Sequence, residues 1–530
     1  MKYLVIALKG TYCEIGGQLQ SIGVPKKLFR LDRLMELGAW VSRRKSIANV
    51  LVIRHQDFHA PAFGALESIH AVLRGMAGQQ KELWYYATEY DLVDIYLSGA
   101  CTHRIIHPLG TLCLRGLAWQ QLFFKEMLDK HGVEVDVFRR GSYKSAADPF
   151  RCTTFDQYNR EQIERLLEVM VQTLSSEIMK VSAYSQQILD SLLQGATLTA
   201  ADAVAKQLVT ETLSEHELRN RWKQDKLSEA VKKRYRGHFG SGMRIAVLVF
   251  EGSIVDGSNR EDALMGQCIG DDFMVKQIRK LRENKRIKGV VFRINSGGGS
   301  ATASESIQRE LRFLSAEKPL VVSIGPMAAS GGYWISTPGQ RVFAQATSVT
   351  GSIGVIMLHM NIRKPLQNLG LGSETVKQGE FADFGSALRS LSPTERDVLE
   401  QMVDYYYQEF LKLVGNARSM SPEQVHAYAE GRLWTGTDAL KRGLVDEIGG
   451  LEEALTHLRR ALKAETSRIT FHPVVKQPWL ARMINSNMEK DAVAASSAQA
   501  ILKSCCMVQG RPLLIEPFCL GARYTTLLRD

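Results

Sequence analysis

An internal repeat is the feature that most constrains this 530-residue chain. The stretches "KYLVIALKG" (2–10) and "RIAVLVFEG" (244–252) each place a basic residue before an apolar run that ends in a charge and a glycine. The runs "NVLVIR" (49–54) and "GVVFRI" (289–294) follow, with the β-branched content of buried strands. We expect residues 2–8 to form the first strand. A repeat of this size predicts two copies of one folded unit.

The repeat continues into a helical part of each copy. "FRRGSYKSA" (138–146) corresponds to "VKQGEFADF" (376–384). Behind these stretches, Thr154–Gln157 and Ser392–Glu395 both have the pattern of a capping box at the start of a long helix. Strands that alternate with helices imply βα units and parallel pairing, so the predicted fold class is α/β.

The repeat also divides the chain. We expect an N-terminal domain over residues 1–220, a polar and basic linker over 221–243, and a C-terminal domain over 244–462. Residues 463–530 carry no clear pattern and stay unassigned. The chain is long enough for two cores, because single cores rarely grow beyond about 250–300 residues.

The two copies differ in their chemistry. Aligning the shared tyrosines places Val93 of the first copy opposite Ser330, and "HQDFHA" opposite the glycine run "INSGGG" (294–299). Conversely, Lys144 lies opposite Ala382. One copy thus keeps a serine and a glycine loop, and the other keeps a lysine. These reciprocal losses predict one active site divided between two domains.

A serine and a lysine can form such a site only if the serine has a neighbouring base and the lysine is neutral. A serine hydroxyl is a poor nucleophile until a neighbouring base takes its proton. A lysine is a base only when neutral, so its pKa must fall from about 10.4, and burial away from water produces that fall. We therefore expect Ser330 as nucleophile and Lys144 as general base in a closed site. Gly298, Gly299 and Gly331 are the candidate backbone N–H donors for the oxyanion.

Composition excludes several other classes. The net charge of +11 is spread along the chain rather than gathered in a patch, which argues against a nucleic-acid partner. The eight cysteines include no CxxC pair, and His55 and His59 lack an HExxH context, so we expect no metal and no cofactor. The N-terminal run "YLVIAL" is far shorter than a membrane span, and no signal peptide is visible. The sequence predicts a soluble or peripheral protein.

Five stretches carry a family resemblance: "RINSGGGS", "MAASGGYWIST", "TSVTGSIGV", "FRRGSYKSAADPF" and "GRLWTGTDALKRGLVDEIGG". Together they resemble the signal peptide peptidase A (protease IV) family in its long, double-domain form, over roughly residues 1–460. The resemblance implies tandem crotonase/ClpP-like domains, built of repeated ββα units, in one chain. It implies a Ser–Lys dyad of Ser330 and Lys144, with Ser352 orienting the lysine amine. In the oxyanion loop, Gly297 stands where the family usually has proline.

The resemblance also implies a substrate and a setting. It implies an endopeptidase that degrades cleaved signal peptides and other hydrophobic peptides through an acyl-enzyme. It further implies a homotetramer at the bacterial inner membrane, although no anchor is visible in this sequence and a peripheral membrane contact is the expectation here.

Two other hypotheses remain at this stage. The first is an α/β-hydrolase esterase in which Asp446 and His457 complete a triad with Ser330. It leaves the duplication and the reciprocal losses unexplained. The second is a catalytically inactive ClpP-like scaffold, against which the retained serine, lysine and glycine loop argue.

Overall fold

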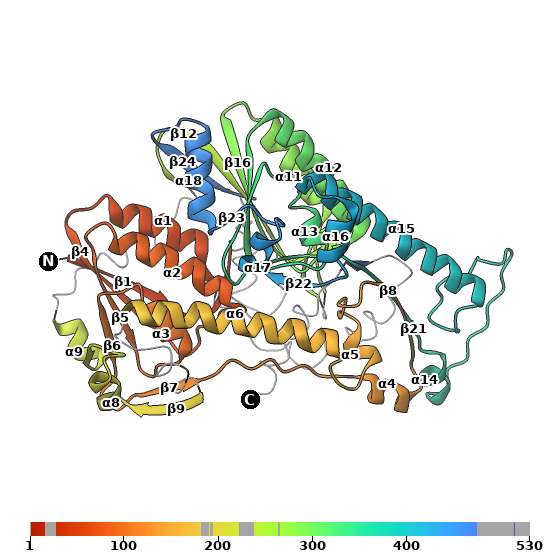
Figure 1. Ribbon diagram of the computed structural model, residues 1–530, viewed down its shortest axis with the longest axis horizontal. Coiled ribbons are helices and arrows are strands. Elements are labelled where there is room, and N and C mark those ends of the chain that lie inside the picture. The colour runs from red at the N-terminus through yellow and green to blue at the C-terminus, as the bar shows by residue number, and fades with distance from the viewer. Residues whose placement is uncertain are drawn as a thin grey trace, which may run out of the picture.

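The computed structural model describes residues 2–15, 28–181, 190, 194–221, 238–262, 265–473 and 513–514. Most of the predicted linker, 222–237, and most of the C-terminal extension, 474–512 and 515–530, lie outside the described residues. In Figure 1 the sheet of the first half lies at the lower left, with α6, α4 and α5 extending along the bottom to the lower right, and the sheet of the second half lies in the upper part.

The first half is built on a parallel sheet with the order β1-β4-β5-β6-β10. Its strands are β1 (Lys2–Leu8), β4 (Ile47–Arg54), β5 (Glu82–Ala87), β6 (His103–Ile106) and β10 (Glu211–Thr212). Between them run α1 (Leu31–Ser42), α2 (Phe63–Ala77) and α3 (Leu92–Ser98). The first strand has the predicted bounds.

The second half repeats this arrangement. The strands β12 (Met243–Glu251), β16 (Ile287–Ser296), β18 (Leu320–Ala329) and β19 (Arg341–Ala344) pair in parallel, in the order that β1-β4-β5-β6 have in the first half. The helices α11 (Asp271–Glu283), α12 (Ala301–Glu317) and α18 (Leu451–Ala461) accompany them. The same order of strands in both sheets is what the internal repeat predicts.

The second sheet also recruits segments that the sequence left without an element. β24 (Ser467–His472) pairs in parallel with β12, and β11 (His238–Gly240) pairs with β24. Thus part of the extension beyond residue 462 and the end of the expected linker complete the second half. At its far edge the sheet carries β20 (Val349–Gly351), β22 (Leu433–Thr435) and β23 (Glu447–Ile448).

A third sheet joins the two halves. Its order is β14-β15-β13-β17-β25-β21-β8. The strand from the first half is β8 (Glu134–Arg140), which pairs antiparallel with β21 (Val355–Asn361). The others are β13 (Ser253–Val255), β14 (Arg260–Asp262), β15 (Gly266–Gly270), β17 (Gly299–Ser300) and β25 (Leu513–Leu514). Through β8, the first half contributes a strand to this sheet, and that strand pairs with β21 of the second half (Figure 1).

Two long helices flank this junction, α6 (Gln157–Val181) and α15 (Pro393–Arg418). Ser392 and Glu395 form the predicted capping box of α15, with proline at the first position. The box predicted at Thr154 is wrong. There the Asp156 carboxylate accepts the N–H of Asn159 at 2.8 Å, because a carboxylate next to the first turn competes successfully for that donor.

The remaining elements are short. They are β2 (Thr11–Cys13), β3 (Leu28–Arg30), β7 (Thr111–Arg115), β9 (Gln194–Thr199), α4 (Lys125–His131), α5 (Asp148–Arg151), α8 (Ala200–Ala205), α9 (Glu215–Asn220), α13 (Gly331–Trp334), α14 (Arg363–Asn368), α16 (Pro422–Tyr428) and α17 (Gly436–Lys441).

The halves share their apolar interior. One cluster of buried side chains runs from α1, α2 and β4 of the first half to β12 and α18 of the second. A second cluster fills the space between the second sheet, α11, α12 and α15. Because the first cluster crosses the boundary, the relative position of the halves is set by packing.

Candidate active site

Ser330 lies at a sharp turn between strand β18 and helix α13. Its φ of 56° and ψ of −119° lie outside the regions that residues with a side chain prefer, and the residue is fully buried. A Cβ on Gly331 would lie 2.6 Å from Ser304 Oγ, so the turn needs glycine there. Backbone strain of this kind costs of order 1–3 kcal/mol and gathers at functional sites.

Lys144 reaches this turn from the first half. It follows β8 by a few residues, and the backbone N–H of Tyr143 donates to Glu430 O at 2.9 Å. The Lys144 side chain is fully buried. Its Nζ donates to Ser330 Oγ at 2.8 Å, to Ser352 Oγ at 2.8 Å and to Ser352 O at 3.2 Å.

Ser352 completes the contact from a second strained turn. It follows β20 with a φ of 50° and is fully buried. Its N–H donates to Arg432 O at 2.7 Å, while the N–H of Ser330 donates to Gly351 O at 2.9 Å. The two serine turns are therefore linked through the backbone. The structure brings together the three side chains that the sequence selected from three separate segments.

Two residues that hold the lysine loop were missed in the sequence. Gln162 of α6 is buried, and its Nε2 donates to Tyr143 O at 3.2 Å and to Ser145 Oγ at 2.9 Å, on either side of Lys144. Its Oε1 accepts the N–H of Leu433 at 3.2 Å. A single polar residue on the inner face of an amphipathic helix has no spacing that marks this task.

Gly431 is the second such residue. A Cβ at this position would lie 2.6 Å from Lys144 Cβ, and its φ of 72° also favours glycine. Gly431 begins a stretch that continues into β22 and the start of α17. Gly431 allows this stretch to pack directly against the lysine.

The glycine loop after β16 lies beside Ser330. A Cβ on Gly331 would come within 3.2 Å of Gly299 N, so the backbone amides of these two residues are neighbours. The N–H of Gly298 donates to Ser296 Oγ at 3.1 Å. Gly331 is the first residue of α13, and the first N–H groups of a helix have no acceptor within the helix. Gly299 lies in β17, where it pairs with Ile254 and Leu514.

An extended segment of the chain lies against this loop. Leu513 and Leu514 of β25 pair antiparallel with Ser300 and Gly299, and Leu513 also pairs antiparallel with Ile356 of β21. A peptide backbone therefore fits between β17 and β21, with hydrogen-bonding strands on both sides.

A buried polar network supports β16 upstream of the glycine loop. The fully buried Arg293 donates to both carboxylate oxygens of Glu14, at 2.9 and 3.1 Å, which joins the second half to the first. The N–H of Glu14 in turn donates to Glu251, which also accepts from Asn295 Nδ2 at 3.3 Å. Burial, together with the nearby Glu14 carboxylate, raises the pKa of Glu251 to about 8.

The residues of the alternative triad have other contacts. Asp446 accepts the N–H of Val342 at 2.7 Å and pairs with Arg418 at 3.2 Å. His457 packs edge-on against Phe343, and its Nδ1 lies 4.0 Å from Glu447. The structure brings neither side chain to Ser330, whose Oγ instead accepts a hydrogen bond from Lys144 Nζ.

Two features are absent from the described residues, a metal-binding cluster and a membrane-spanning helix. Within those residues, no group of three or more His, Cys, Asp or Glu side chains could hold a metal ion. None of the helices in the described part of the chain is both long and apolar enough to cross a membrane.

Comparisons with known proteins give close agreement over most of the chain. A protein called Protease 4 from Salmonella typhi is 29% identical over 506 residues, which cover 91% of this chain and 81% of that protein. Protease 4 from Haemophilus influenzae is 30% identical and covers 83% of this chain and 74% of its own length. The chloroplastic serine protease SPPA of Arabidopsis thaliana is 28% identical over 76% of this chain and 62% of that protein.

Among solved structures, a ClpP1 mutant from Listeria monocytogenes overlaps 40% of this chain and 94% of its own, at 15% identity and a TM-score of 0.26. At that score the overlap carries no weight, and the evidence for the fold is the strand order of the two sheets.

The relatives and the duplicated α/β halves define the class of this protein: it is a serine peptidase. The chain belongs to peptidase family S49, whose model matches it twice, over residues 77–228 and 312–465. The two matches fall one in each half, in agreement with the internal repeat.

Proposed function

We propose that this peptidase works through a Ser–Lys dyad divided between its halves, with Ser330 as nucleophile and Lys144 as general base. The observation that carries the proposal is the 2.8 Å contact between Lys144 Nζ and Ser330 Oγ, both fully buried. Burial away from water favours the neutral amine over the ammonium ion, and only the neutral amine accepts a proton. Ser352 Oγ, at 2.8 Å from Nζ, orients the amine.

The steps of hydrolysis follow from this arrangement. Ser330 Oγ forms a bond to the scissile carbonyl carbon as its proton moves to Lys144 Nζ. The carbonyl oxygen becomes an oxyanion, which the N–H groups of Gly299 and Gly331, with Gly298 beside them, would stabilise. The C–N bond then breaks as the leaving amine takes the proton from Nζ. Water then attacks the acyl carbonyl carbon as Nζ takes its proton, and Nζ returns a proton to Ser330 Oγ as the ester C–O bond breaks and the acid leaves.

The substrate is an extended peptide. A strand that pairs with β17 on one side and β21 on the other would place its backbone beside Ser330, and main-chain hydrogen bonds give such binding its affinity. The pairing of Leu513 and Leu514 with both strands supports this geometry. We propose hydrophobic peptides, including the remnants of cleaved signal peptides, in line with the resemblance and with the relative called SPPA.

The finer points of fold and setting belong to the same proposal. We assign each half a crotonase/ClpP-like fold of repeated ββα units, expect four copies in the assembly, and expect any membrane contact to be peripheral. The mass of the assembly in solution and co-sedimentation with vesicles of anionic phospholipid measure the last two points.

Labelling tests the nucleophile directly. A fluorophosphonate should modify Ser330, and mass spectrometry of the digested protein should find the adduct on the peptide that contains it. Ser330→Ala should remove the label, and Lys144→Met should slow it strongly, because the hydroxyl loses its base. Ser98→Ala, which removes a buried hydroxyl in the first half, is the matched control and should label normally. An adduct on another serine would contradict the assignment.

A further inference from the structure

The loop that carries Lys144 has a counterpart in the second half, where Ala382 takes the place of the lysine. Both loops begin at a glycine with a positive φ, which is 107° at Gly141 and 103° at Gly379. Each loop then leads to the start of a long helix, α6 in the first half and α15 in the second. The second loop therefore shows which contacts are made at this place when no lysine is present.

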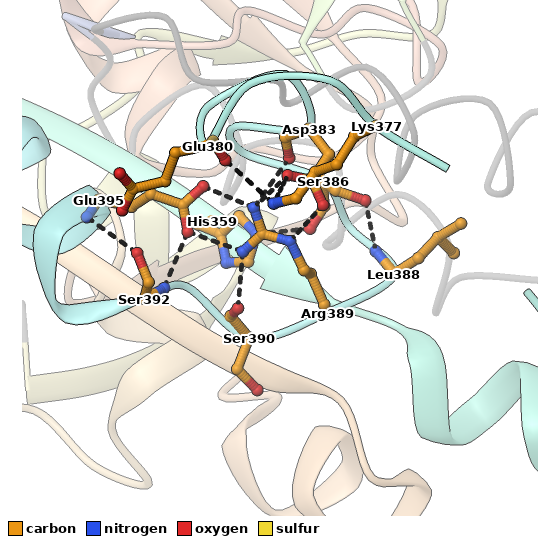
Figure 2. A network of polar contacts seen from close by, with 10 residues as sticks. All are labelled: His359, Lys377, Glu380, Asp383, Ser386, Leu388, Arg389, Ser390, Ser392 and Glu395. Carbon is orange, nitrogen blue, oxygen red and sulfur yellow. Dashed lines mark hydrogen bonds and ion pairs between the residues drawn. The ribbon is translucent and has the colours of Figure 1, made fainter. Parts of the chain in front are cut away.

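Two cations hold the second loop in place (Figure 2). Arg389 donates from Nε and Nη2 to the two oxygens of Asp383, at 2.7 and 2.9 Å, and from both Nη atoms to the Glu395 carboxylate in the first turn of α15, at 2.6 and 2.7 Å. Lys377 Nζ donates to Asp383 Oδ1 at 2.7 Å and to Glu380 O at 3.0 Å. We call the two cations and the carboxylate that they share the loop frame.

The first half has cations at the same two positions of its loop. Arg139 corresponds to Lys377, because each lies two residues before the glycine that begins its loop. In the same register, Arg151 corresponds to Arg389. The carboxylate that Arg139 and Arg151 share is Asp148, at the start of α5, and its side chain is fully buried. Both copies of the repeat therefore contain a loop frame.

Arg151 fastens the first loop to its long helix, as its counterpart does in the second half. Its Nε donates to Asp148 Oδ1 at 2.7 Å, and its Nη2 lies 2.7 Å from the same oxygen. Nη2 also donates to Asp156 Oδ2 at 3.2 Å, and Asp156 accepts the N–H of Asn159 in the first turn of α6. The Asp148 carboxylate is thus fixed to the start of α6.

The two loop frames differ in the carbonyl that they hold. Arg139 Nη1 donates to the carbonyl oxygen of Lys144 at 3.1 Å and lies 3.6 Å from Asp148 Oδ1. Its counterpart Lys377 donates instead to Glu380 O, which lies two residues before the position of the missing lysine. In the first half, the loop frame therefore ends on the backbone of the proposed general base itself.

The position of this backbone matters because a lysine side chain is long and flexible. The amine of Lys144 must stay at 2.8 Å from both Ser330 Oγ and Ser352 Oγ. Gly431 packs against Cβ of the lysine, and Arg139 fixes its carbonyl group, so the start of the stem is held on two sides. A catalytic group that moves by about 1 Å can lose about 100-fold in rate.

We propose that Arg139 is a positioning residue of this peptidase. It holds the carbonyl group of Lys144, while Asp148 and Arg151 hold Arg139 from behind, and it thereby places the amine between the two serines of the site. This inference rests on the dyad proposed above. Arg139 acts through the lysine and does not contact the peptide, so its loss should lower kcat and leave KM unchanged.

Arg139→Gln tests the contact, because the glutamine amide ends before the place of Nη1 and the hydrogen bond to Lys144 O is lost. We expect kcat for a fluorogenic hydrophobic peptide, per folded molecule, to fall by about 10- to 100-fold at unchanged KM. Arg139→Lys should restore most of this loss, because one nitrogen makes both contacts and an ammonium group has three donors. A parental kcat in Arg139→Gln, or a rise in KM alone, would overturn the proposal.

The second half supplies the matched controls. Lys377→Gln makes the equivalent change in a loop frame without a lysine, and its kcat should equal that of the parent. An equal loss of kcat in Lys377→Gln and Arg139→Gln would show a general structural role and overturn the proposal. If Arg139→Gln does not fold, Arg151→Gln replaces it: kcat should fall by a smaller factor, whereas Arg389→Gln should lower only the free energy of unfolding in urea. A parental kcat in Arg151→Gln would then count against the positioning role.

Lys144→Met separates failure of this inference from failure of the dyad. Substantial activity in Lys144→Met would remove the dyad and with it the task of Arg139. An inactive Lys144→Met together with a fully active Arg139→Gln would leave the dyad in place and overturn the positioning role alone. Circular dichroism of each variant gives the folded fraction to which kcat is referred.

Discussion

The turn after β5 and the turn after β18 occupy equivalent places in the two halves, and they are built in opposite ways. In the first half, Asp91 caps α3 through a full capping box with Asp94. Asp94 is fully buried and accepts from Arg54, from the Tyr85 hydroxyl at 2.9 Å and from the N–H of Asp91 at 2.8 Å. In the second half, Ser330 begins α13 without any side-chain cap.

The first turn contributes to stability, and the second turn holds a reactive side chain. In the first turn, carboxylates accept the N–H groups of Asp91, Val93 and Asp94, and the turn has no positive φ. The second keeps a strained serine whose hydroxyl contacts a lysine from the other half. A duplicated chain can therefore place strain in one copy and stabilising contacts in the other. We therefore expect substitutions at the two turns to have different effects.

The largest effect should come from the dyad. Ser330→Ala and Lys144→Met should each lower kcat for a fluorogenic hydrophobic peptide by about 10⁴-fold or more, because the nucleophile and its base act as one unit. The double variant should be little worse than either single variant. Adding Val93→Ser to Ser330→Ala should restore nothing, since that position is in a regular helix. Substantial activity in either single variant would remove the basis of the dyad.

The next effect should be on stability and in the first half. Asp94→Ala removes the acceptor of the buried Tyr85 hydroxyl and one of the two carboxylates that pair with Arg54, Asp91 being the other, which should cost about 1–3 kcal/mol of unfolding free energy. Activity per folded molecule should stay close to that of the parent. Glu317→Ala, which breaks an exposed ion pair with Arg282, is the control and should cost under about 1 kcal/mol. Urea unfolding measures both; equal costs would show that the capped turn carries no special stability.

The long-range features of this molecule were readable from the sequence. The duplicated strand pattern predicts the shared order of β1-β4-β5-β6 and β12-β16-β18-β19, because buried parallel strands leave continuous apolar runs. The reciprocal losses led to Ser330 and Lys144, which the structure brings to 2.8 Å. Differences between the copies indicate functional residues because the residues that the common fold needs occur in both copies.

Sequence analysis did not predict the short strands or the contacts between segments that are distant in sequence. β17 and β13 are too short to show any period, so the third sheet had no signal in the sequence. Gly431 packs against Lys144 across the junction between the halves, and Gln162 contacts the Lys144 loop from another segment of the same half, so only the packed structure brings these residues together. The start of α6 was misread because Thr154 and Asp156 both offer a capping oxygen, and local sequence does not decide between them.

A smaller loss of activity should follow from Ser352→Ala. The variant removes one of the oxygens at 2.8 Å from Lys144 Nζ but leaves the carbonyl contact at 3.2 Å, so the amine keeps part of its orientation. One such hydrogen bond corresponds to about 10- to 100-fold in kcat. KM should hardly change, because Ser352 orients the base and does not bind peptide. A rise in KM with unchanged kcat would assign Ser352 to substrate binding, and Ser98→Ala again serves as the buried-hydroxyl control.

The smallest effect at neutral pH should come from His70→Gln. His70 in α2 and Gln308 in α12 hold the same place counted from the first residue of each helix. Burial, with a smaller contribution from Arg74, lowers the pKa of His70 to about 4. The folded protein therefore binds fewer protons than the unfolded chain between pH 6.5 and 4. The contribution of the neutral His70 to the unfolding free energy is complete above pH 6.5 and is lost as the pH falls through 4.

The difference in unfolding free energy between pH 7.5 and pH 4 should consequently be smaller in His70→Gln than in the parent, by up to about 3 kcal/mol. Urea unfolding at the two pH values gives this quantity, and because both proteins share every other titrating group, the change between them isolates His70. The variant carries the residue that the second half already tolerates in a buried site, so it should fold normally at pH 7.5. An identical pH dependence in both proteins would mean that His70 accepts a proton in the folded state as readily as in the unfolded chain.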